Sequence, residues 1–574
     1  MAGGLIGARL PLMTSPPSSL EHQALARLKA GDAAGAEQDL LGALTAVTGA
    51  SRSRILAALG EARLAQGYAL EGAKALQEAG SDPRLQLRRA HMLIQGGRFP
   101  AALEALGKLP AAARQGFDFW SLKADALRQT GRWSEAADAA AQALKAKPAS
   151  RNMTLVRAAG LGHAGKWAEA APLFQRYPDF PPAIEMNAGA LVGSGRTADA
   201  RALLSSALGR FPADAALHRA RAMIAWMDGE KETFADALIA AADARPSDLA
   251  LGMAAADLLR RAGRHEQSLA RLDALRRLAP LPQLDSAAAI VLSALGRHAE
   301  AAALARSSAA QLPRVDWVRR NAACILLSAG GAEEARVHSD WGLALDELDQ
   351  EWLAIDAVAR RAAGDESYRR TYDYDRFVQA FDLAPPDGYA TTEDFIHALA
   401  ERLRELHDFS NHPLDQSLRG GSQLQLNPDV PQDPLIEKLF GALKAPINQY
   451  IDSLGQDPSH PHLSRKTGRW RMQGAWSVRL VKGGSHVNHI HPEGWISSAF
   501  YVVVPPSVRP ESNSAEGWIT FGEPFFPVDG IASERAVCPK AGRLVLFPSY
   551  MWHGVNAFTE DAERISVAFD LVPD

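Results

Sequence analysis

A glycine recurs through the first two thirds of the chain at nearly constant spacing. Eleven such glycines lie 30 to 36 residues apart, most often 34, and more than half are followed by Arg or Lys. The segments between them are rich in alanine and leucine, with apolar positions at helical spacing. This period is typical of a solenoid of stacked helical pairs. The phased glycines are Gly31, Gly67, Gly97, Gly131, Gly165, Gly195, Gly229, Gly263, Gly296, Gly330 and Gly364.

Prolines keep the same phase. Two units of 30 residues, which begin at Gly97 and Gly165, have a proline thirteen residues after the glycine, at Pro110 and Pro178. In five other units the proline follows after seventeen residues. We expect each proline to end the second helix of its unit, and the second helix of the two short units to be shorter by one turn. The five prolines are Pro148, Pro212, Pro246, Pro280 and Pro313.

The unit around Trp120 resembles the tetratricopeptide repeat. The resemblance covers roughly residues 20–370, which we predict to be one helical solenoid. It implies a concave surface that binds a peptide or protein partner. We interpret the repeat residues themselves as packing positions. Those that match the family's spacing are Trp120, Ala124, Leu127, Gly131, Ala136, Ala143 and Pro148.

The composition changes after Gly364, where aromatic residues become frequent. We place the domain boundary near residue 375 and predict a second domain over 375–574, with a helical lead-in over 375–465. Helices are predicted at 395–407 and within 431–454, and we expect them to cover a barrel on one side. The stretch 456–466, which contains two histidines, is interpreted as a surface loop.

The last hundred residues alternate between short apolar strands and turns. This pattern predicts a closed antiparallel barrel or jelly roll. The fold class is therefore multidomain α plus β, with an N-terminal helical solenoid and a C-terminal barrel buttressed by helices. A hairpin turn is expected at 482–485. The predicted strands are 474–481, 486–491, 497–504, 517–521, 543–547 and 564–571.

Three histidines and an arginine mark one end of these strands. His489 and His491 alternate along a strand and therefore share a face. His553 follows an apolar strand that ends at Phe547-Pro548, and Arg564 comes eleven residues later. We predict a metal site at the mouth of the barrel.

This arrangement is similar to the Fe(II)- and 2-oxoglutarate-dependent oxygenases, whose double-stranded β-helix (jelly-roll) barrel carries His-x-Asp, a distal His and Arg-x-Ser. One bacterial branch of them is often fused to tetratricopeptide repeats. The resemblance implies that His489, His491 and His553 hold Fe(II), and that Arg564 and Ser566 bind 2-oxoglutarate. It implies a dioxygenase that uses O2 to hydroxylate a side chain of a peptide or protein, which the repeats would recruit.

Two points of the site stay open at this stage. His491 stands where the family has a carboxylate, so either His491 is the third ligand, or another carboxylate or a water takes its place. Glu493 shares the parity of His491, but we expect Pro492 to end the strand before it. Tyr501 is either a further donor to 2-oxoglutarate or a core side chain.

Two other function classes fit parts of the sequence. One is a non-catalytic repeat scaffold with a degenerate barrel, and the other is a three-histidine, cupin-like dioxygenase that needs no 2-oxoglutarate. The net charge of -4 argues against nonspecific nucleic-acid binding. We expect no membrane partner, because no run of about 18 apolar residues occurs. Residues 1–20 do not resemble a signal peptide, and two cysteines suit a reducing compartment, so we predict a cytoplasmic protein.

Overall fold

The computed structural model describes residues 19–45, 47–407, 414, 416–426, 433–511 and 514–574. The start of the chain, where no signal peptide is predicted, lies outside the described residues up to residue 18. The chain divides into two compact units, residues 1–160 and 161–574, and each is described by itself. Within the described ranges, every helix is too short or too polar to cross a bilayer.

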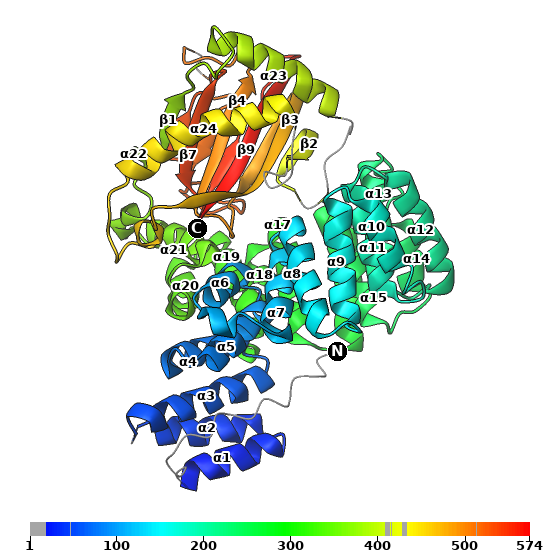
Figure 1. The fold of residues 1–574 in the computed structure, drawn as a ribbon, viewed down its shortest axis with the longest axis vertical. Helices are drawn as coiled ribbons and strands as arrows, with labels where there is room; N and C mark the ends of the chain where they lie inside the picture. Colours follow the sequence, from blue (N-terminus) through cyan, green and yellow to red (C-terminus); the bar gives the residue numbers. More distant parts are fainter. Residues whose placement is uncertain (1–18, 46, 408–413, 415, 427–432, 512–513) are drawn as a thin grey trace. The chain divides into compact units, whose positions relative to one another are not determined.

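The first unit consists of antiparallel helical pairs, shown in blue and cyan in Figure 1. Small residues fill the space between paired helices, and Gly60 and Gly72 lie so close that a methyl group on either would meet the other's carbonyl oxygen at about 3 Å. The helices are α1 (Ser19–Lys29), α2 (Ala33–Leu44), α3 (Gly49–Ala65), α4 (Ala69–Ala79), α5 (Pro83–Gln95), α6 (Phe99–Gly107), α7 (Phe117–Gln129) and α8 (Trp133–Ala146). Helix α9 (Arg151–His163) spans the limit between the units.

The second unit continues the helical pairs and then adds a sheet. The buried positions of its helical pairs are mostly alanine and leucine. The helices are α10 (Trp167–Phe174), α11 (Pro181–Gly193), α12 (Thr197–Arg210), α13 (Ala215–Met227), α14 (Asp236–Asp243), α15 (Leu249–Arg261), α16 (His265–Leu278), α17 (Pro282–Ala294), α18 (His298–Gln311), α19 (Asp316–Ser328), α20 (Ala332–Leu345) and α21 (Gln350–Ala362). The one-turn helix α22 (Tyr374–Phe377) leads into the sheet.

The phased glycines are the turns between the two helices of each pair. All eleven have φ between 71° and 92°, a left-handed conformation that side chains with a Cβ avoid. Helices α6 and α10 contain 9 and 8 residues, against 14 in α8, as the earlier prolines of those two units predict. The helical solenoid is thus confirmed.

The C-terminal sheet is antiparallel and curled into a jelly-roll barrel, as predicted. Its strand order is β1-β7-β4-β9-β3-β8-β5-β6, with β2 beside β3. The strands are β1 (Gln379–Asp382), β2 (Leu418–Leu426), β3 (Trp470–His489), β4 (Ile496–Val503), β5 (Ile519–Phe521), β6 (Arg535–Val537), β7 (Arg543–Pro548), β8 (His553–Val555) and β9 (Arg564–Pro573).

Two helices cover one face of this sheet. Helices α23 (Thr392–Leu406) and α24 (Pro434–Ser453) lie across the strands in Figure 1. The hydroxyl of Thr391 caps α23 by accepting from the Asp394 amide. Apolar side chains of both helices, such as Phe395 and Leu443, share one buried core with Phe500 of β4. The predicted buttress is therefore confirmed.

One predicted turn is absent. The segments 474–481 and 486–491 were expected to be two strands joined by a hairpin at 482–485, but residues 474–489 all belong to the single strand β3. Strand β2 pairs with β3 on both sides of the glycines, with Arg419 opposite Ser485 and Gly421 opposite Leu480. The glycines therefore form a bulge within a continuous strand rather than a reversal.

The two histidines of the stretch 456–466 are buried, unlike the exposed residues expected of a surface loop. His460 and His462 are 2% and 1% exposed, and the ring of His462 packs against those of Phe377, Trp495 and Tyr550. The apolar neighbours of these histidines lie far away in the sequence, so no local pattern indicated their burial.

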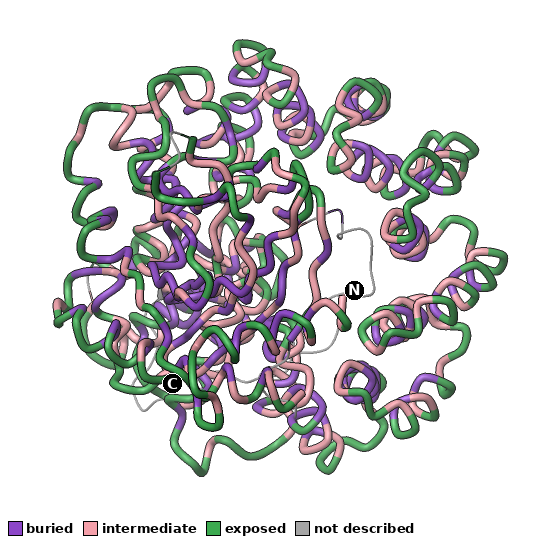
Figure 2. The backbone as a smooth tube through the Cα atoms, turned by 90° about the horizontal axis from the view of Figure 1, so that it is seen from above, coloured by how far each residue is buried: buried purple, intermediate pink, exposed green. Residues whose placement is uncertain are grey.

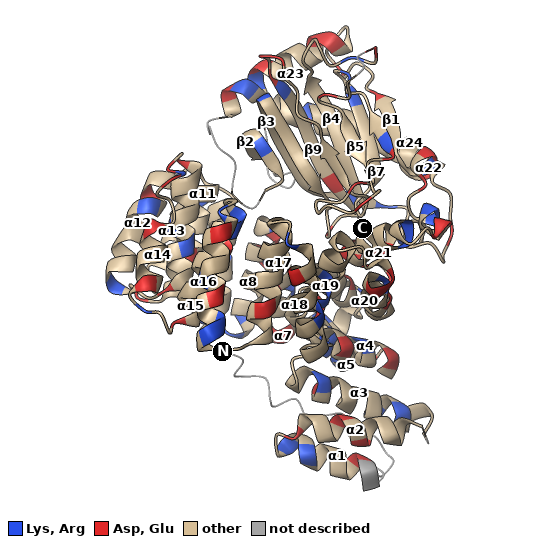
Figure 3. Ribbon diagram, turned by 180° about the vertical axis from the view of Figure 1, so that it is seen from behind, with Lys and Arg blue, Asp and Glu red and all other residues tan. Residues whose placement is uncertain are grey.

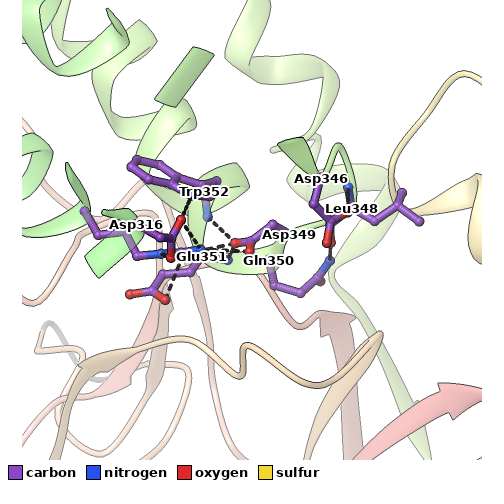
Figure 4. Close-up of polar contacts among 8 residues, drawn as sticks. Asp316, Asp346, Leu348, Asp349, Gln350, Glu351 and Trp352 are labelled. Atoms are coloured by element: carbon purple, nitrogen blue, oxygen red, sulfur yellow. Dashed lines mark hydrogen bonds and ion pairs between the residues drawn. The ribbon is translucent and has the colours of Figure 1, made fainter. Parts of the chain in front are cut away.

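Helix α21 belongs to the repeats and to the core of the barrel at once. Its residues from Trp352 to Ala359 are all buried, and they share a core with Phe377 and Phe547. In Figure 4, Asp349 caps the helix by accepting from the amides of Glu351 and Trp352, while the Trp352 indole donates to Asp316 at 2.9 Å. The domain limits predicted near residues 370 and 375 stay a prediction.

Burial is distributed differently in the two kinds of structure. In Figure 2 the exposed backbone gathers in the turns between helices, and each helix is buried along one side only. In Figure 3 acidic and basic residues are interspersed over the helices, whereas the strands are mostly uncharged. A charged side chain inside the barrel is therefore an exception that calls for an explanation.

Candidate metal centre

Three imidazoles converge at one end of the barrel. The ligand-capable atoms of His489, His491 and His553 all lie within 4.8 Å of one another. His489 pairs with His553 across β3 and β8, and their ring centroids are 4.3 Å apart. His491 lies just beyond the end of β3, where its amide donates to the Ser549 carbonyl. The structure thus brings together the three histidines predicted from the sequence.

Each of these imidazoles has its Nδ1 in a hydrogen bond. His489 Nδ1 donates to the Val487 carbonyl at 2.8 Å, and His553 Nδ1 donates to the Met551 carbonyl at 2.9 Å. His491 Nδ1 donates to the carboxylate of Asp570 at 2.6 Å. These bonds fix the proton on Nδ1, so in the neutral rings the Nε2 lone pairs remain to bind a metal ion.

Burial keeps the imidazoles of His489 and His553 neutral. Desolvation, helped by the neighbouring His491, lowers the pKa of His489 to about 3. The pKa of His553 is also held well below its usual value by burial and by His489. Only an unprotonated imidazole can bind a metal, so the site is available to a cation at neutral pH.

Glu493 lies outside the cluster. Strand β3 ends before it, and its carboxylate accepts from the Gln473 side chain at 3.2 Å. Burial and the nearby Asp570 raise the pKa of Glu493 to about 7. Among the described residues, no carboxylate joins the three histidines in the set that could hold a metal.

A fourth histidine lies beside the cluster. The ring of His486 stacks on that of His489 with centroids 5.9 Å apart, and its Nδ1 is 3.1 Å from the Ser417 hydroxyl. The same hydroxyl lies 3.5 Å from His489 Nε2. Ser417 comes from the polar segment directly before β2.

A second part of the site is a buried cation on β9. Arg564 is 1% exposed and pairs in register with Leu480 of β3, inside the barrel. Its NH1 donates to Ser566 Oγ at 3.3 Å, and its guanidinium lies 5.1 Å from the ring centre of Tyr501. Desolvation lowers the pKa of Arg564, against a smaller opposing effect of Tyr501.

This cation has no acidic partner. No carboxylate among the described residues forms an ion pair with Arg564, and its Nε has no hydrogen-bond partner there. The Tyr501 hydroxyl is also buried, and beside Arg564 it has no other hydrogen-bond partner among the described residues; desolvation raises the pKa of Tyr501 to about 12. A buried charge without a partner of opposite charge is costly in free energy. The side chains of Arg564, Ser566 and Tyr501 therefore form a site that fits an anion, which we call the anion cradle.

Two tryptophans near the site are core residues. Trp552 precedes His553 but is 3% exposed, and its indole donates to the carbonyl of Ala354 in α21. Trp495 is 1% exposed and donates to the His462 carbonyl. Phe525, in contrast, is 59% exposed, and its ring lies 5.7 Å from that of Trp552.

Comparison with known families finds matches to two parts of the chain. Residues 474–570, from β3 to β9, match the family described as "Putative 2OG-Fe(II) oxygenase". Tetratricopeptide repeat families match residues 87–151, 122–183 and 163–224. The chain thus contains one segment that matches tetratricopeptide repeats and another that matches the "Putative 2OG-Fe(II) oxygenase" family. Both resemblances inferred from the sequence are thereby confirmed.

Several solved structures are similar to parts of the chain. A tetratricopeptide repeat protein from Parabacteroides merdae is 19% identical, covering 41% of this chain and 96% of its own, with a TM-score of 0.34. Yeast Tom70 is 11% identical, covering 79% of this chain and 98% of its own, with a TM-score of 0.31. At these TM-scores we base no argument on either. No curated protein matches the chain.

Proposed function

We propose that this protein is an Fe(II)- and 2-oxoglutarate-dependent dioxygenase that hydroxylates a side chain of a peptide or protein. The observation that carries the proposal is the buried, uncompensated Arg564 in the same barrel as three imidazoles whose Nε2 atoms are available. A metal site alone would not need an anion cradle. A metal site together with a cradle suits a ligand that chelates the metal at one end and carries a carboxylate at the other.

Different residues would bind the iron and the co-substrate. His489, His491 and His553 would hold the iron through Nε2, and their Nδ1 hydrogen bonds would keep the rings oriented. Arg564 would bind the distal carboxylate of 2-oxoglutarate, with Ser566 and Tyr501 donating from the same cradle. The bound iron and co-substrate would supply the activation of O2, and the buried walls would keep bulk water away.

The proposed substrate class rests on the fusion. Tetratricopeptide repeats generally mediate protein interactions, and here they precede the oxygenase domain in one chain. Binding a partner to the repeats would raise its concentration near the iron. A peptide or protein side chain is therefore the proposed target, rather than a free metabolite.

Anaerobic titration of the Fe(II)-loaded protein with 2-oxoglutarate tests the proposal. We expect a visible charge-transfer band that is absent from a His553→Ala variant. Bound iron without a band would favour the three-histidine dioxygenase that needs no co-substrate, an alternative supported by the all-histidine cluster. Failure to bind iron at all would favour the other alternative, a non-catalytic repeat scaffold with a degenerate barrel.

A further inference from the structure

Asp570 lies on the same strand face as the anion cradle, near the opposite end of β9. Arg564, Ser566 and Asp570 are separated by even numbers of residues and therefore point to one side of the strand. Asp570 pairs in register with Ser497 of β4. Its Oδ1 accepts from His491 Nδ1 at 2.6 Å and from the Ser497 hydroxyl at 2.7 Å.

This contact makes His491 different from the other two histidines. His489 and His553 donate to backbone carbonyls, which are neutral acceptors. Only His491 donates to a carboxylate. A hydrogen bond to an ionised acceptor is roughly twice as strong as one between neutral groups, and it makes the opposite ring nitrogen a better metal ligand.

The charge of Asp570 lacks a counter-ion in its surroundings. Its side chain is 15% exposed, and within the described part of the chain its one ion-pair partner is His491, which is 13% exposed. No Lys or Arg of that part pairs with it. A carboxylate in such a place is stabilised when a cation lies nearby. A divalent ion on the far nitrogen of His491 would be that cation.

Two serines hold the carboxylate in place. The Ser497 and Ser549 hydroxyls are 2.9 Å apart, so Ser497 can donate its one proton to Asp570 while accepting from Ser549. Gly494 passes so close that a Cβ there would lie 2.3 Å from Ser549 Oγ. The turn after His491 is thus packed tightly on these groups.

We propose that Asp570 is a positioning residue for the metal centre. It would fix the ring of His491 and supply, through that ring, the negative charge that a directly bound carboxylate would give. This inference rests on the proposed function, because it assumes that His491 binds the iron. It accounts for a cluster that contains three neutral ligands and no carboxylate.

The test is an Asp570→Asn variant of the full chain. Asparagine keeps the size and one acceptor oxygen but removes the charge. We expect the Fe(II) dissociation constant, measured anaerobically against a chromogenic chelator, to rise about 10- to 100-fold. The charge-transfer band of the complex with Fe(II) and 2-oxoglutarate should move to shorter wavelength, because the iron becomes less electron-rich.

Ser498→Ala is the matched control. The Ser498 hydroxyl makes two hydrogen bonds to the backbone of Phe569, next to Asp570, but touches neither Asp570 nor His491. This variant should bind Fe(II) as the wild type does, with an unshifted band. Equal losses in both variants would mean that disturbing β9 is enough, and the inference would fall.

The remaining outcomes separate this inference from the proposed function. Wild-type affinity and an unshifted band in Asp570→Asn, with a normal wild-type band, would overturn the role of Asp570 and leave the dioxygenase standing. A wild-type protein that binds no Fe(II) would overturn both.

Discussion

At the scale of single residues, the strongest evidence for a ligand is a charge that the protein does not neutralise by itself. Arg564 is buried without an acidic partner, and its Nε lacks a hydrogen bond among the described residues. In the ligand-free protein this charge costs free energy. A bound carboxylate would offset that cost, so the same residue should weaken the empty barrel and strengthen the loaded one.

An Arg564→Met variant tests this reasoning. Removing the charge should stabilise the ligand-free protein by about 1 kcal/mol or more in urea unfolding, because methionine fits an apolar site. The variant should lose at least about 100-fold in 2-oxoglutarate affinity, since a charged bidentate contact is lost, while retaining Fe(II). Arg479→Met, which removes a half-buried arginine of β3 that pairs with Glu563, is the control. A destabilised Arg564→Met protein with normal 2-oxoglutarate binding would contradict the assignment.

Alanine variants of two neighbouring histidines, one inside the imidazole cluster and one beside it, test which histidines bind the metal. His553→Ala should abolish Fe(II) retention, because it removes one of three convergent nitrogens. His486→Ala should leave Fe(II) bound, since His486 stacks on His489 but lies outside the cluster. Metal content after desalting under anaerobic conditions decides the matter. Loss of iron from His486→Ala alone would place the metal on a different set of histidines.

At the scale of elements, the sequence predicted those helices and strands whose residues recur at a regular spacing. Helix pairs, their shortened members and the alternation of His489 with His491 follow from spacing alone. The long strand β3 was missed because Gly483-Gly484 has the same local pattern in a hairpin and in a bulge. Only the pairing with β2, far away in the sequence, distinguishes the two. Asp570 was missed likewise, although its parity with Arg564 and Ser566 was visible in the sequence.

The two glycines of this bulge should respond differently to a methyl group. Gly483 has φ of 76°, and a methyl group there would have no other atom within 4 Å, so Gly483→Ala should cost only the left-handed conformation, about 1 kcal/mol. A Cβ on Gly484 would lie 2.6 Å from the carbonyl oxygens of Gly420 and Val481. Gly484→Ala should therefore cost about 3 kcal/mol in urea unfolding, and Fe(II) affinity should fall as β2 and Ser417 move. Equal costs at both positions would show that β3 is not held by β2 here.

At the scale of the whole molecule, the repeats and the barrel share a core through α21. The Trp552 indole donates to Ala354, and Arg361 donates to the carbonyls of Gly522 and Ala532. Tyr368 and Tyr374 both donate to Glu534. The composition of the sequence placed a boundary near 375, because aromatic residues become frequent after Gly364. It could not show that these aromatic side chains pack against α21, the last helix of the repeats.

Two fragments separate the contribution of α21 from that of the rest of the solenoid. A fragment of residues 375–574 lacks α21 and would expose the apolar face that Trp352 and its neighbours cover, so we expect it to aggregate or to lose cooperative unfolding. A fragment of residues 282–574 keeps α17 to α21 and should fold and bind Fe(II) and 2-oxoglutarate like the full chain. Thermal unfolding and the charge-transfer titration measure both properties.

The same longer fragment tests recruitment. If the repeats before α17 bind the protein substrate, residues 282–574 should turn over 2-oxoglutarate without substrate at the full-length rate, yet hydroxylate the native substrate much more slowly at low concentration. Raising the substrate concentration should restore the rate, because the repeats would contribute effective concentration and no chemistry. A fragment that equals the full chain at every substrate concentration would show that those repeats serve another partner. A folded, iron-binding 375–574 fragment would show that α21 covers the barrel without being needed to hold it together.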